Sequence, residues 1–533
     1  MNKALYNIVL LVFIGFVFAN CANRGRPEGG PKDELPPKIV DELPKNFSTN
    51  FNGKLIKIYF DEYVKIKDVQ KQLIISPPMT TQPEITPLGG ASKYITIKIF
   101  DTLQPSTTYA FNFGNSITDN NEGNPYPYYR YVFSTGSYID SLSVKGTIMD
   151  ALKRKPETFV NVALYEVDST FNDSVIYQKK PKYITNTLDS VTTFSIENIK
   201  AGKYMLVGLK DANGDNKFQQ KTDQIAFHKS FITVPTDSLY TLKLFNEALD
   251  FKAFRPALAA TQKIAVGFEG DYRKMKIKIK TETPIASRIT KDEKSDTLYY
   301  WFKPKLEVDS LTLNVSHTNF DKDFTVKMRK QKKDSLIIKA NPAGTIGLDE
   351  PFQITGTIPF VSFDASKVSL IDNDSIKVDF TTAYDSISNT YAFNFKKKEE
   401  SKYSMMVLPD AFVDFFDTKN DTLKYALNTR KASDFGFVRF TLVNATYPLI
   451  IQLTDEKGEV KAEKYTTKPE TIDFLNLQPN TYFIRVIYDT NGNGIYDTGN
   501  YLKKIQPEKV SHFDEVEVRA DWGYPLTLEF TSG

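Results

Sequence analysis

The sequence predicts an all-β chain of several sandwich domains in a row, and three observations support this fold class. The 533 residues include 29 tyrosines and 39 phenylalanines, and aromatic residues are enriched in strands. Residues 55–60 and 94–99 alternate between apolar and polar side chains, which is typical of strands with one buried face. Clusters of glycine, proline and asparagine separate such runs, as turns do. The length allows about three to five domains.

The first 21 residues combine a positive charge, a short apolar run and the chain's only cysteine. Lys3 precedes residues 8–18, which have the length of a signal-peptide core and are too short for a permanent membrane helix. Residues 18–21 (FANC) resemble the lipobox of bacterial lipoproteins, which implies a signal peptide over 1–20 and acylation of Cys21. The alternative is an ordinary secretory signal with a cysteine there by chance.

Residues 21–35 are rich in glycine, proline and charge, and we expect them to form a flexible tether. Their short charged cluster Lys32-Asp33-Glu34 resembles the acidic export signals of Bacteroidota surface lipoproteins, which implies the cell-surface side of the outer membrane. A merely solvated tether explains the same residues. The net charge of +3 is spread along the chain, so no basic footprint for nucleic acid is present.

Residues 36–141 are predicted to form the first sandwich. The elements follow in order as Pro36, Pro37, Pro44 and residues 60–62, 103–105, 108–111 and 131–135. This order of strands and prolines resembles a bacterial Ig-like domain, and the N-terminal part as a whole is similar to a Bacteroidota family of Ig-like-domain lipoproteins. That family offers no catalytic motif to carry over.

Residues 142–246 and 434–533 are predicted to be two copies of one module. One offset of 278 residues aligns Asn198 with Asn476, Tyr204 with Tyr482 and the loop at 211–214 with that at 489–492, without a gap. The element order resembles the transthyretin-like sandwich of carboxypeptidase regulatory domains.

Between these copies we expect a β-sandwich over 247–344 and an Ig-like sandwich over 345–433. The boundary is placed near the prolines of Asn341-Pro342 and Glu350-Pro351. The predicted architecture is thus five sandwiches in an extended chain.

The repeated loop is the candidate metal site. Its oxygen side chains recur at alternate positions, and Ca²⁺ takes six to eight oxygen ligands in a loose shell. Such a run resembles the calcium loops of β-sandwich spacers on cell surfaces. Asx turns that only stabilise the loop are the alternative. The candidate calcium ligands are Asp211, Asn213, Asp215 and Asp223 in the first copy, and Asp489, Asn491, Asn493 and Asp497 in the second.

Catalytic motifs are missing from the sequence. The three histidines, His228, His317 and His512, fall in different predicted domains, and no metalloprotease, nucleophile-elbow or P-loop pattern occurs. Tyr126 and Tyr128 could instead form a flat surface on which sugar rings stack. Core packing at period two explains the neighbouring tyrosines equally well.

These observations predict a non-enzymatic lipoprotein of the outer membrane, anchored by lipid and facing the cell surface. We expect it to be a scaffold or accessory subunit of an integral outer-membrane protein complex, for barrel assembly, secretion or import. The alternative is a glycan-binding lipoprotein of a polysaccharide-uptake system.

Overall fold

The computed structural model describes residues 33–188 and 192–530, and nearly all of its regular structure is β-strand. The predicted all-β class, with sandwiches in tandem, is confirmed. The predicted signal peptide, Cys21 and most of the predicted tether lie outside the described residues. In the part of the chain that the structure describes, no helix is long and apolar enough to cross a membrane.

The first sandwich packs two sheets around one apolar cluster. Ile56, Ile58 and Phe111 are fully buried at its centre, because alternate residues of each strand point to the same face. One sheet has the order β1 (Ile39–Leu43), β2 (Leu55–Ile66), β5 (Ser92–Lys98), β4 (Glu84–Thr86), with β7 (Ile117–Asp119) also beside β2, and the other is β3 (Ile74–Ser76), β6 (Thr108–Asn112), β8 (Arg130–Ser134).

The second and fifth sandwiches share one topology, which confirms the repeat. In each, the last strand lies parallel to the first, and the tyrosine of the repeat donates its hydroxyl hydrogen to a carbonyl four residues earlier (Tyr204 to Lys200, 3.0 Å; Tyr482 to Gln478, 2.9 Å). The second sandwich comprises β11 (Tyr183–Asn186), β10 (Asn161–Glu166), β13 (Gly202–Lys210), β14 (Gln224–Phe227) and β15 (Ile232–Val234), facing β12 (Thr193–Ile199), β9 (Leu142–Asp150) and β16 (Leu239–Leu244). The fifth comprises β37 (Val460–Thr466), β36 (Leu449–Thr454), β39 (Asn480–Tyr488) and β40 (Val510–Val518), facing β38 (Ile472–Leu477), β35 (Gly436–Val443) and β41 (Gly523–Glu529).

The third and fourth sandwiches lie between these copies, each with its own apolar cluster. The third comprises β17 (Lys252–Ala253), β18 (Ala257–Ala260), β19 (Lys263–Glu269), β22 (Thr297–Lys303) and β21 (Ala286–Lys291), facing β20 (Lys276–Lys280), β23 (Ser310–His317) and β24 (Phe320–Lys327). The fourth comprises β25 (Ile338–Asn341), β27 (Phe352–Gly356), β31 (Thr390–Phe395) and β30 (Phe380–Asp385), with β26 (Gly344–Thr345), β34 (Leu423–Asn428), β32 (Lys402–Val407) and β29 (Val368–Ile371), and a β28 (Phe360–Phe363) and β33 (Phe412–Asp414) ribbon. Four single-turn helices complete the described elements: α2 (Val69–Gln72), α3 (Val175–Gln178), η1 (Ala365–Lys367) and η2 (Ala432–Asp434).

The boundary predicted after residue 344 falls too late in the chain. Strand β25 pairs with β27, and Leu336 and Ile338 pack on the core of the fourth sandwich. Asn341-Pro342 lies between β25 and β26, inside that sandwich. A proline that ends a strand within a domain looks the same in sequence as one in a linker.

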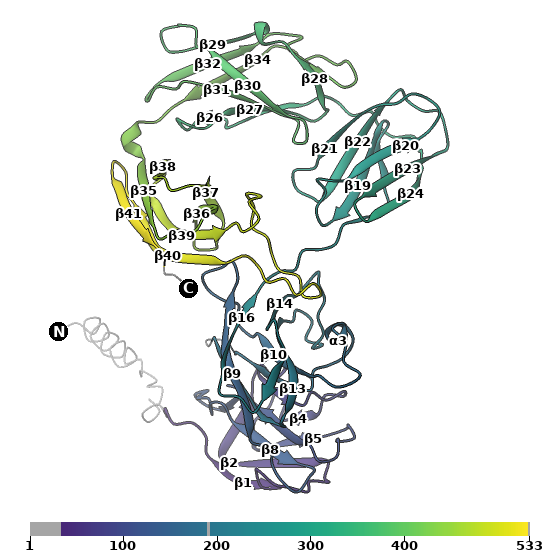
Figure 1. The fold of residues 1–533 in the computed structure, drawn as a ribbon, viewed down its shortest axis with the longest axis vertical. Coiled ribbons are helices and arrows are strands. Elements are labelled where there is room, and N and C mark those ends of the chain that lie inside the picture. The colour runs from purple at the N-terminus through teal and green to yellow at the C-terminus, as the bar shows by residue number, and fades with distance from the viewer. Residues whose placement is uncertain (1–32, 189–191, 531–533) are drawn as a thin grey trace, which may run out of the picture.

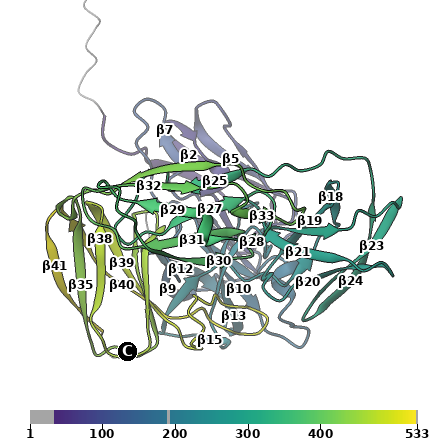
Figure 2. The same ribbon diagram turned by 90° about the horizontal axis from the view of Figure 1, so that it is seen from above.

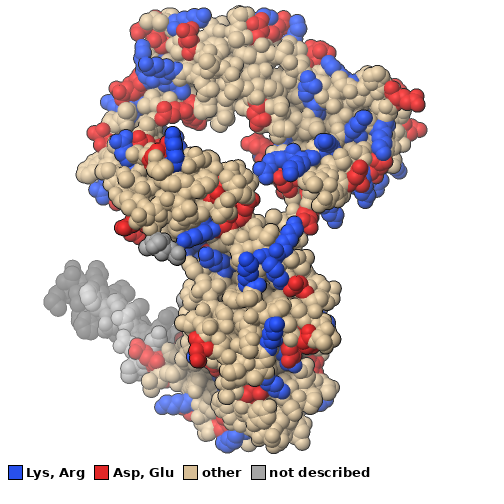
Figure 3. Space-filling view, viewed as in Figure 1, with Lys and Arg blue, Asp and Glu red and all other residues tan. Residues whose placement is uncertain are grey.

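The five sandwiches do not form a straight string. The second, third, fourth and fifth close into a ring, in which the fifth returns to the second, and the first hangs from the second at the far end (Figures 1 and 2). An opening remains between the domains of the ring in the space-filling view (Figure 3). A cluster of Trp301, Ile358 and Phe415 joins the third sandwich to the fourth.

Candidate functional site

The contact that closes the ring is made by residues 489–509, which we call the closure loop. It connects β39 to β40 in the fifth sandwich, and it is 21 residues long where the matching loop of the second sandwich, 211–223, has 13. A connection longer than about 12–15 residues is uncommon and often functional. The extra residues leave the fifth sandwich and pack on the second.

Tyr501 is the centre of this contact. Its side chain has no exposed surface and lies in a cluster of the second sandwich that includes Met205, Phe218 and Phe227. The Tyr501 hydroxyl donates to the carbonyl oxygen of Asp173 at 2.9 Å, and its backbone N–H donates to Glu247 at 2.6 Å. Burial raises the pKa of this hydroxyl, so it remains a donor at neutral pH.

The closure loop approaches the second sandwich closely at Gly499. A Cβ atom added there would lie 2.6 Å from the Phe245 ring, which is too close for an ordinary contact. Thr498 donates to the carbonyl oxygen of Asn246 at 2.6 Å, and Lys504 pairs with Asp173 at 2.6 Å. Glycine at 499 therefore allows Tyr501 to reach its cluster.

Two arginines make a second contact between the same sandwiches. Arg154 donates to the carbonyl oxygen of Phe513 at 3.0 Å, and Arg485 donates to that of Leu152 at 3.2 Å. Lys155 and Glu456 are paired at 3.9 Å. These polar groups join the two sandwiches at a place separate from the Tyr501 insertion.

Both repeated loops hold their shape through their own backbone. Asp211 accepts from the N–H groups of Asn213, Gly214 and Asn216, and Asp489 accepts from those of Gly492, Asn493 and Gly494. Hydrogen bonds of this type are those of Asx turns.

At one pair of matching positions, the acid and the amide side chains are swapped between the two copies. Gln219 donates its amide to Asp215 at 3.0 Å, whereas at the matching positions Asn493 donates to Asp497 at 2.7 Å. The position of Asp497 is therefore that of Gln219, and Asp497 is not the counterpart of Asp223.

The counterpart of Asp223 is Glu508, which the sequence analysis missed. Asp223 accepts from the N–H groups of Ala212 and Gln219, and Glu508 accepts from those of Thr490 and Asp497. The longer closure loop displaces Glu508 along the chain, and this hid the match from an ungapped alignment.

Among the described residues, no three acidic, histidine or cysteine side chains gather around one point as metal ligands. Asp223 and Glu508 face the backbone of their loops. A calcium ion would have to share Asp211 or Asp489 with three N–H groups. Calcium binding stays a prediction, and any ion would stiffen the loop.

The two candidate sugar-stacking tyrosines have different surroundings. Tyr126 packs edge-on against Tyr129, with ring centroids 5.7 Å apart, and is partly buried. Tyr128 is 50% exposed and lines a cleft of 180 Å³ between the first and second sandwiches, together with Arg130 and Glu197. Of the two rings, Tyr128 is the one that a ligand can reach.

The three histidines stand apart, as the sequence predicts. His228 contacts the Tyr240 ring edge-on, and its Nδ1 lies 2.8 Å from the carbonyl oxygen of Ser230. His317 stacks on Phe251 at 4.2 Å, and His512 lies at the junction with the second sandwich. Each has a local packing role.

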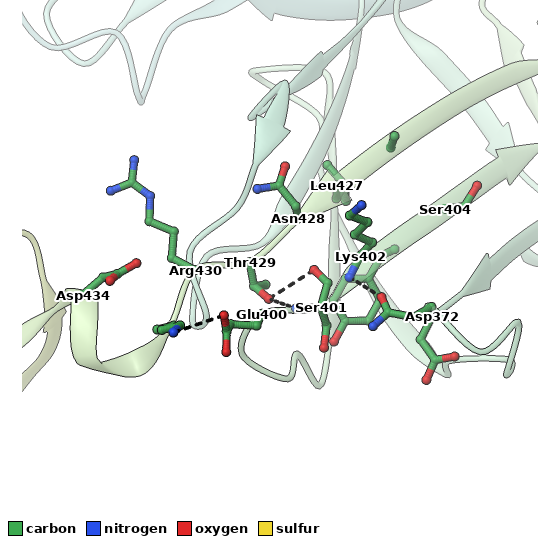
Figure 4. A pocket seen from close by; sticks show the side chains of 14 residues that line it. Asp372, Glu400, Ser401, Lys402, Ser404, Leu427, Asn428, Thr429, Arg430 and Asp434 are labelled. Atoms are coloured by element: carbon green, nitrogen blue, oxygen red, sulfur yellow. Dashed lines mark hydrogen bonds and ion pairs between the residues drawn. The ribbon is translucent and has the colours of Figure 1, made fainter.

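A polar groove of 920 Å³ runs along the outward side of β32 and β34 in the fourth sandwich, towards the start of the fifth (Figure 4). Glu400 pairs with Lys431 at 3.5 Å, and Thr429 and Ser401 hydrogen-bond across its floor. Arg430 points into open space (Figure 4). The groove is open to solvent.

The fold and its junctions define a class: a multidomain chain of β-sandwiches whose domains are fixed by side-chain contacts. Within it, the family described as bacterial Ig-like domain matches residues 33–135, so the Ig-like assignment of the first sandwich is confirmed. No curated protein sequence matches the chain.

Solved structures of tandem domains are similar to the chain at low identity. An S-layer protein, rSbsC(31-844), is 11% identical, with 90% of this chain and 67% of that chain covered and a TM-score of 0.16. The glucan-utilisation protein SGBP-B of Bacteroides ovatus, solved with a mixed-linkage heptasaccharide, is 10% identical, with 70% and 93% covered and a TM-score of 0.17. The I9-I11 tandem of titin is 10% identical, with 52% and 100% covered and a TM-score of 0.12.

Opening the ring is the first testable prediction. Tyr501→Ala removes the buried ring and weakens closure by about 3 kcal/mol, and Gly499→Ala acts in the same direction by collision with Phe245. Small-angle X-ray scattering should show a larger radius of gyration for both. Tyr501→Phe keeps the packing and should stay closed; unchanged scattering for Tyr501→Ala would contradict the role of the insertion.

Acidification should weaken the same junction. Partial burial, with Arg485 and Arg154 nearby, lowers the pKa of His512 from 6.5 to about 4. The unfolded chain then binds this proton more tightly than the folded one, so the stability is fully present above about pH 6.5 and falls as the pH drops towards 4. Screening by water limits the size of this change in stability, because the imidazole ring of His512 is partly exposed. Denaturant titrations at several pH values should show that the free energy of unfolding of the wild type falls between about pH 6.5 and 4. His512→Gln should show a smaller fall over the same range.

The calcium prediction is checked by thermal melting with and without EGTA. Calcium binding requires that EGTA lowers the melting temperature and that Asp211→Ala removes the difference. Asp489→Ala tests the second loop in the same way. Identical melting curves with and without the chelator would contradict a bound ion.

Proposed function

We propose that the chain is a non-enzymatic lipoprotein of the bacterial outer membrane, anchored through Cys21, that serves as a scaffold or accessory subunit of an integral membrane complex. Barrel assembly, secretion and import are the candidate activities of that complex. The observation that carries the proposal is ring closure, which holds four sandwiches in one arrangement through the buried Tyr501.

A closed ring suits a scaffold for a physical reason. A partner that contacts several domains of a flexible string must first order them, and that cost is subtracted from the binding free energy. The contacts at Tyr501 and Trp301 already order the domains in the folded chain, so a partner does not have to order them on binding. Surfaces such as the groove beside Arg430 are then presented at fixed separations.

Affinity purification from detergent-solubilised membranes tests the proposal. The wild-type chain should return a stoichiometric integral membrane protein, and Tyr501→Ala should return about tenfold less because the ordering cost is restored. Tyr501→Phe is the matched control and should behave like the wild type. Equal recovery of the partner by the opened ring would contradict a scaffold that depends on closure.

Glycan binding is the second candidate, favoured by the accessible ring of Tyr128 beside its 180 Å³ cleft. In that case Tyr128→Ala should lose retention on insoluble polysaccharide, because the loss of one stacked aromatic ring costs about 1 kcal/mol or more. Tyr126→Ala is the control, since that ring packs on Tyr129. If Tyr128→Ala were retained as well as the wild type, glycan binding at Tyr128 would be contradicted.

A further inference from the structure

The outward face of the first sheet carries an apolar surface of its own. Alternation along β2 and β5 turns Ile56, Ile58, Ile95 and Ile97 inward, and the register places the opposite residues side by side on the outside. We call the apolar and basic residues on this side the tip face: Leu43, Leu55, Lys57, Tyr59, Tyr94, Lys98 and, just beyond β5, Phe100. Asp41, opposite Tyr59, and Glu84, opposite Lys98, lie on the same side.

The tip face is exposed to a degree that is costly in water. Leu43 is 51% exposed, Leu55 48%, Phe100 47% and Tyr94 43%. Contiguous exposed apolar side chains of this kind mark interaction surfaces, whereas single ones do not. Tyr59 and Tyr94 lie with their rings 5.7 Å apart across the two strands, which joins the apolar residues into one patch.

Two lysines accompany the apolar side chains. The Lys57 ammonium lies 5.3 Å from the centre of the Tyr94 ring, and that of Lys98 lies 5.3 Å from the Phe100 ring. Lysines and tyrosines are both typical of membrane-interface surfaces, and on the same side of the sheet Lys98 also pairs with Glu84 at 3.8 Å.

The tip face points away from the rest of the molecule. The other sheet of the first sandwich faces the second sandwich, where Ser76 accepts from the N–H of Ile184 at 3.1 Å and Arg130 contacts Asn198 at 2.7 Å. Strands β1 and β2 accordingly lie at the end farthest from the ring (Figure 1). No other part of the described chain covers them.

The proposed anchor is close to this end. Eleven residues lie between Cys21 and Asp33, where the described chain begins beside the first sandwich, and at about 3.5 Å per extended residue this stretch reaches about 40 Å at most. The first sandwich is therefore the domain nearest to the proposed anchor along the chain.

We propose that the tip face rests in the headgroup region of the lipid bilayer, so that the chain stands on the membrane with the ring directed away from it. This inference rests on the proposed acylation of Cys21. The acyl chains give the affinity, and the shallow burial of the leucines and aromatic rings sets the orientation, as an amphipathic surface does beside a lipid anchor.

Fluorescence quenching by brominated lipids tests the orientation on the acylated full chain. Because Cys21 is the only cysteine and acylation blocks its thiol, Leu55→Cys introduces a single free thiol for an environment-sensitive label. The vesicles contain phosphatidylethanolamine and phosphatidylglycerol, with or without bromine on the acyl chains. The control is Leu239→Cys, since Leu239 is 80% exposed on the second sandwich.

The label at 55 should lose about threefold in emission on brominated vesicles, and the label at 239 should lose none. Replacing Leu43 and Tyr94 by Ser in the Leu55→Cys chain should reduce the quenching. Protein that floats with the vesicles but shows equal emission at 55 and 239 overturns the membrane-facing tip while leaving the anchor intact. Protein that does not float overturns the anchor, and the orientation with it.

Discussion

The insertion of one aromatic ring from the fifth sandwich into the second determines the shape of the whole molecule. Tyr501 is completely buried among residues more than 250 positions earlier in the chain. Burying an aromatic side chain of this size is worth about 2–3 kcal/mol. The ion pair between Lys504 and Asp173 beside it is partly exposed and adds little, so most of the free energy of the contact comes from the ring.

The insertion exploits a duplicated module. The second and fifth sandwiches have the same topology and the same tyrosine hydrogen bond at the connection between their two sheets, from β12 to β13 and from β38 to β39. Only the fifth has the long loop. The short loop of the second copy contributes Phe218 to the cluster that receives Tyr501. The fifth sandwich therefore provides the inserted side chain, and the second provides the apolar cluster that receives it. The two copies of the repeat bind each other through this contact.

Much of this fold could be predicted from the sequence, because strand alternation and turn residues are local signals. The repeat was visible in the same way, since Tyr204 and Tyr482 keep one register. Ring closure was not predicted, because no local sequence signal distinguishes an aromatic residue that packs in its own domain from one that packs on a distant domain. The signal present in the sequence was the greater length of the loop 489–509 compared with its counterpart 211–223.

The candidate sites were less predictable than the fold. Oxygen side chains at alternate positions indicate both a calcium loop and an Asx turn, and the backbone N–H groups that occupy Asp211 and Asp489 cannot be read from spacing. The tyrosines near 126 differ in accessibility: Tyr128, in a turn with a positive φ of 55°, is exposed, whereas Tyr126 packs on Tyr129. A sequence pattern does not reveal such a turn.

The most direct test of the account needs no substitution. A zero-length carboxyl–amine cross-linker, followed by mass spectrometry of the digested wild-type protein, reports which lysines and acids touch in solution. The closed ring predicts an intramolecular link between Lys504 and Asp173, which are 2.6 Å apart. Links confined to pairs within single sandwiches, with none between 504 and 173, would contradict it.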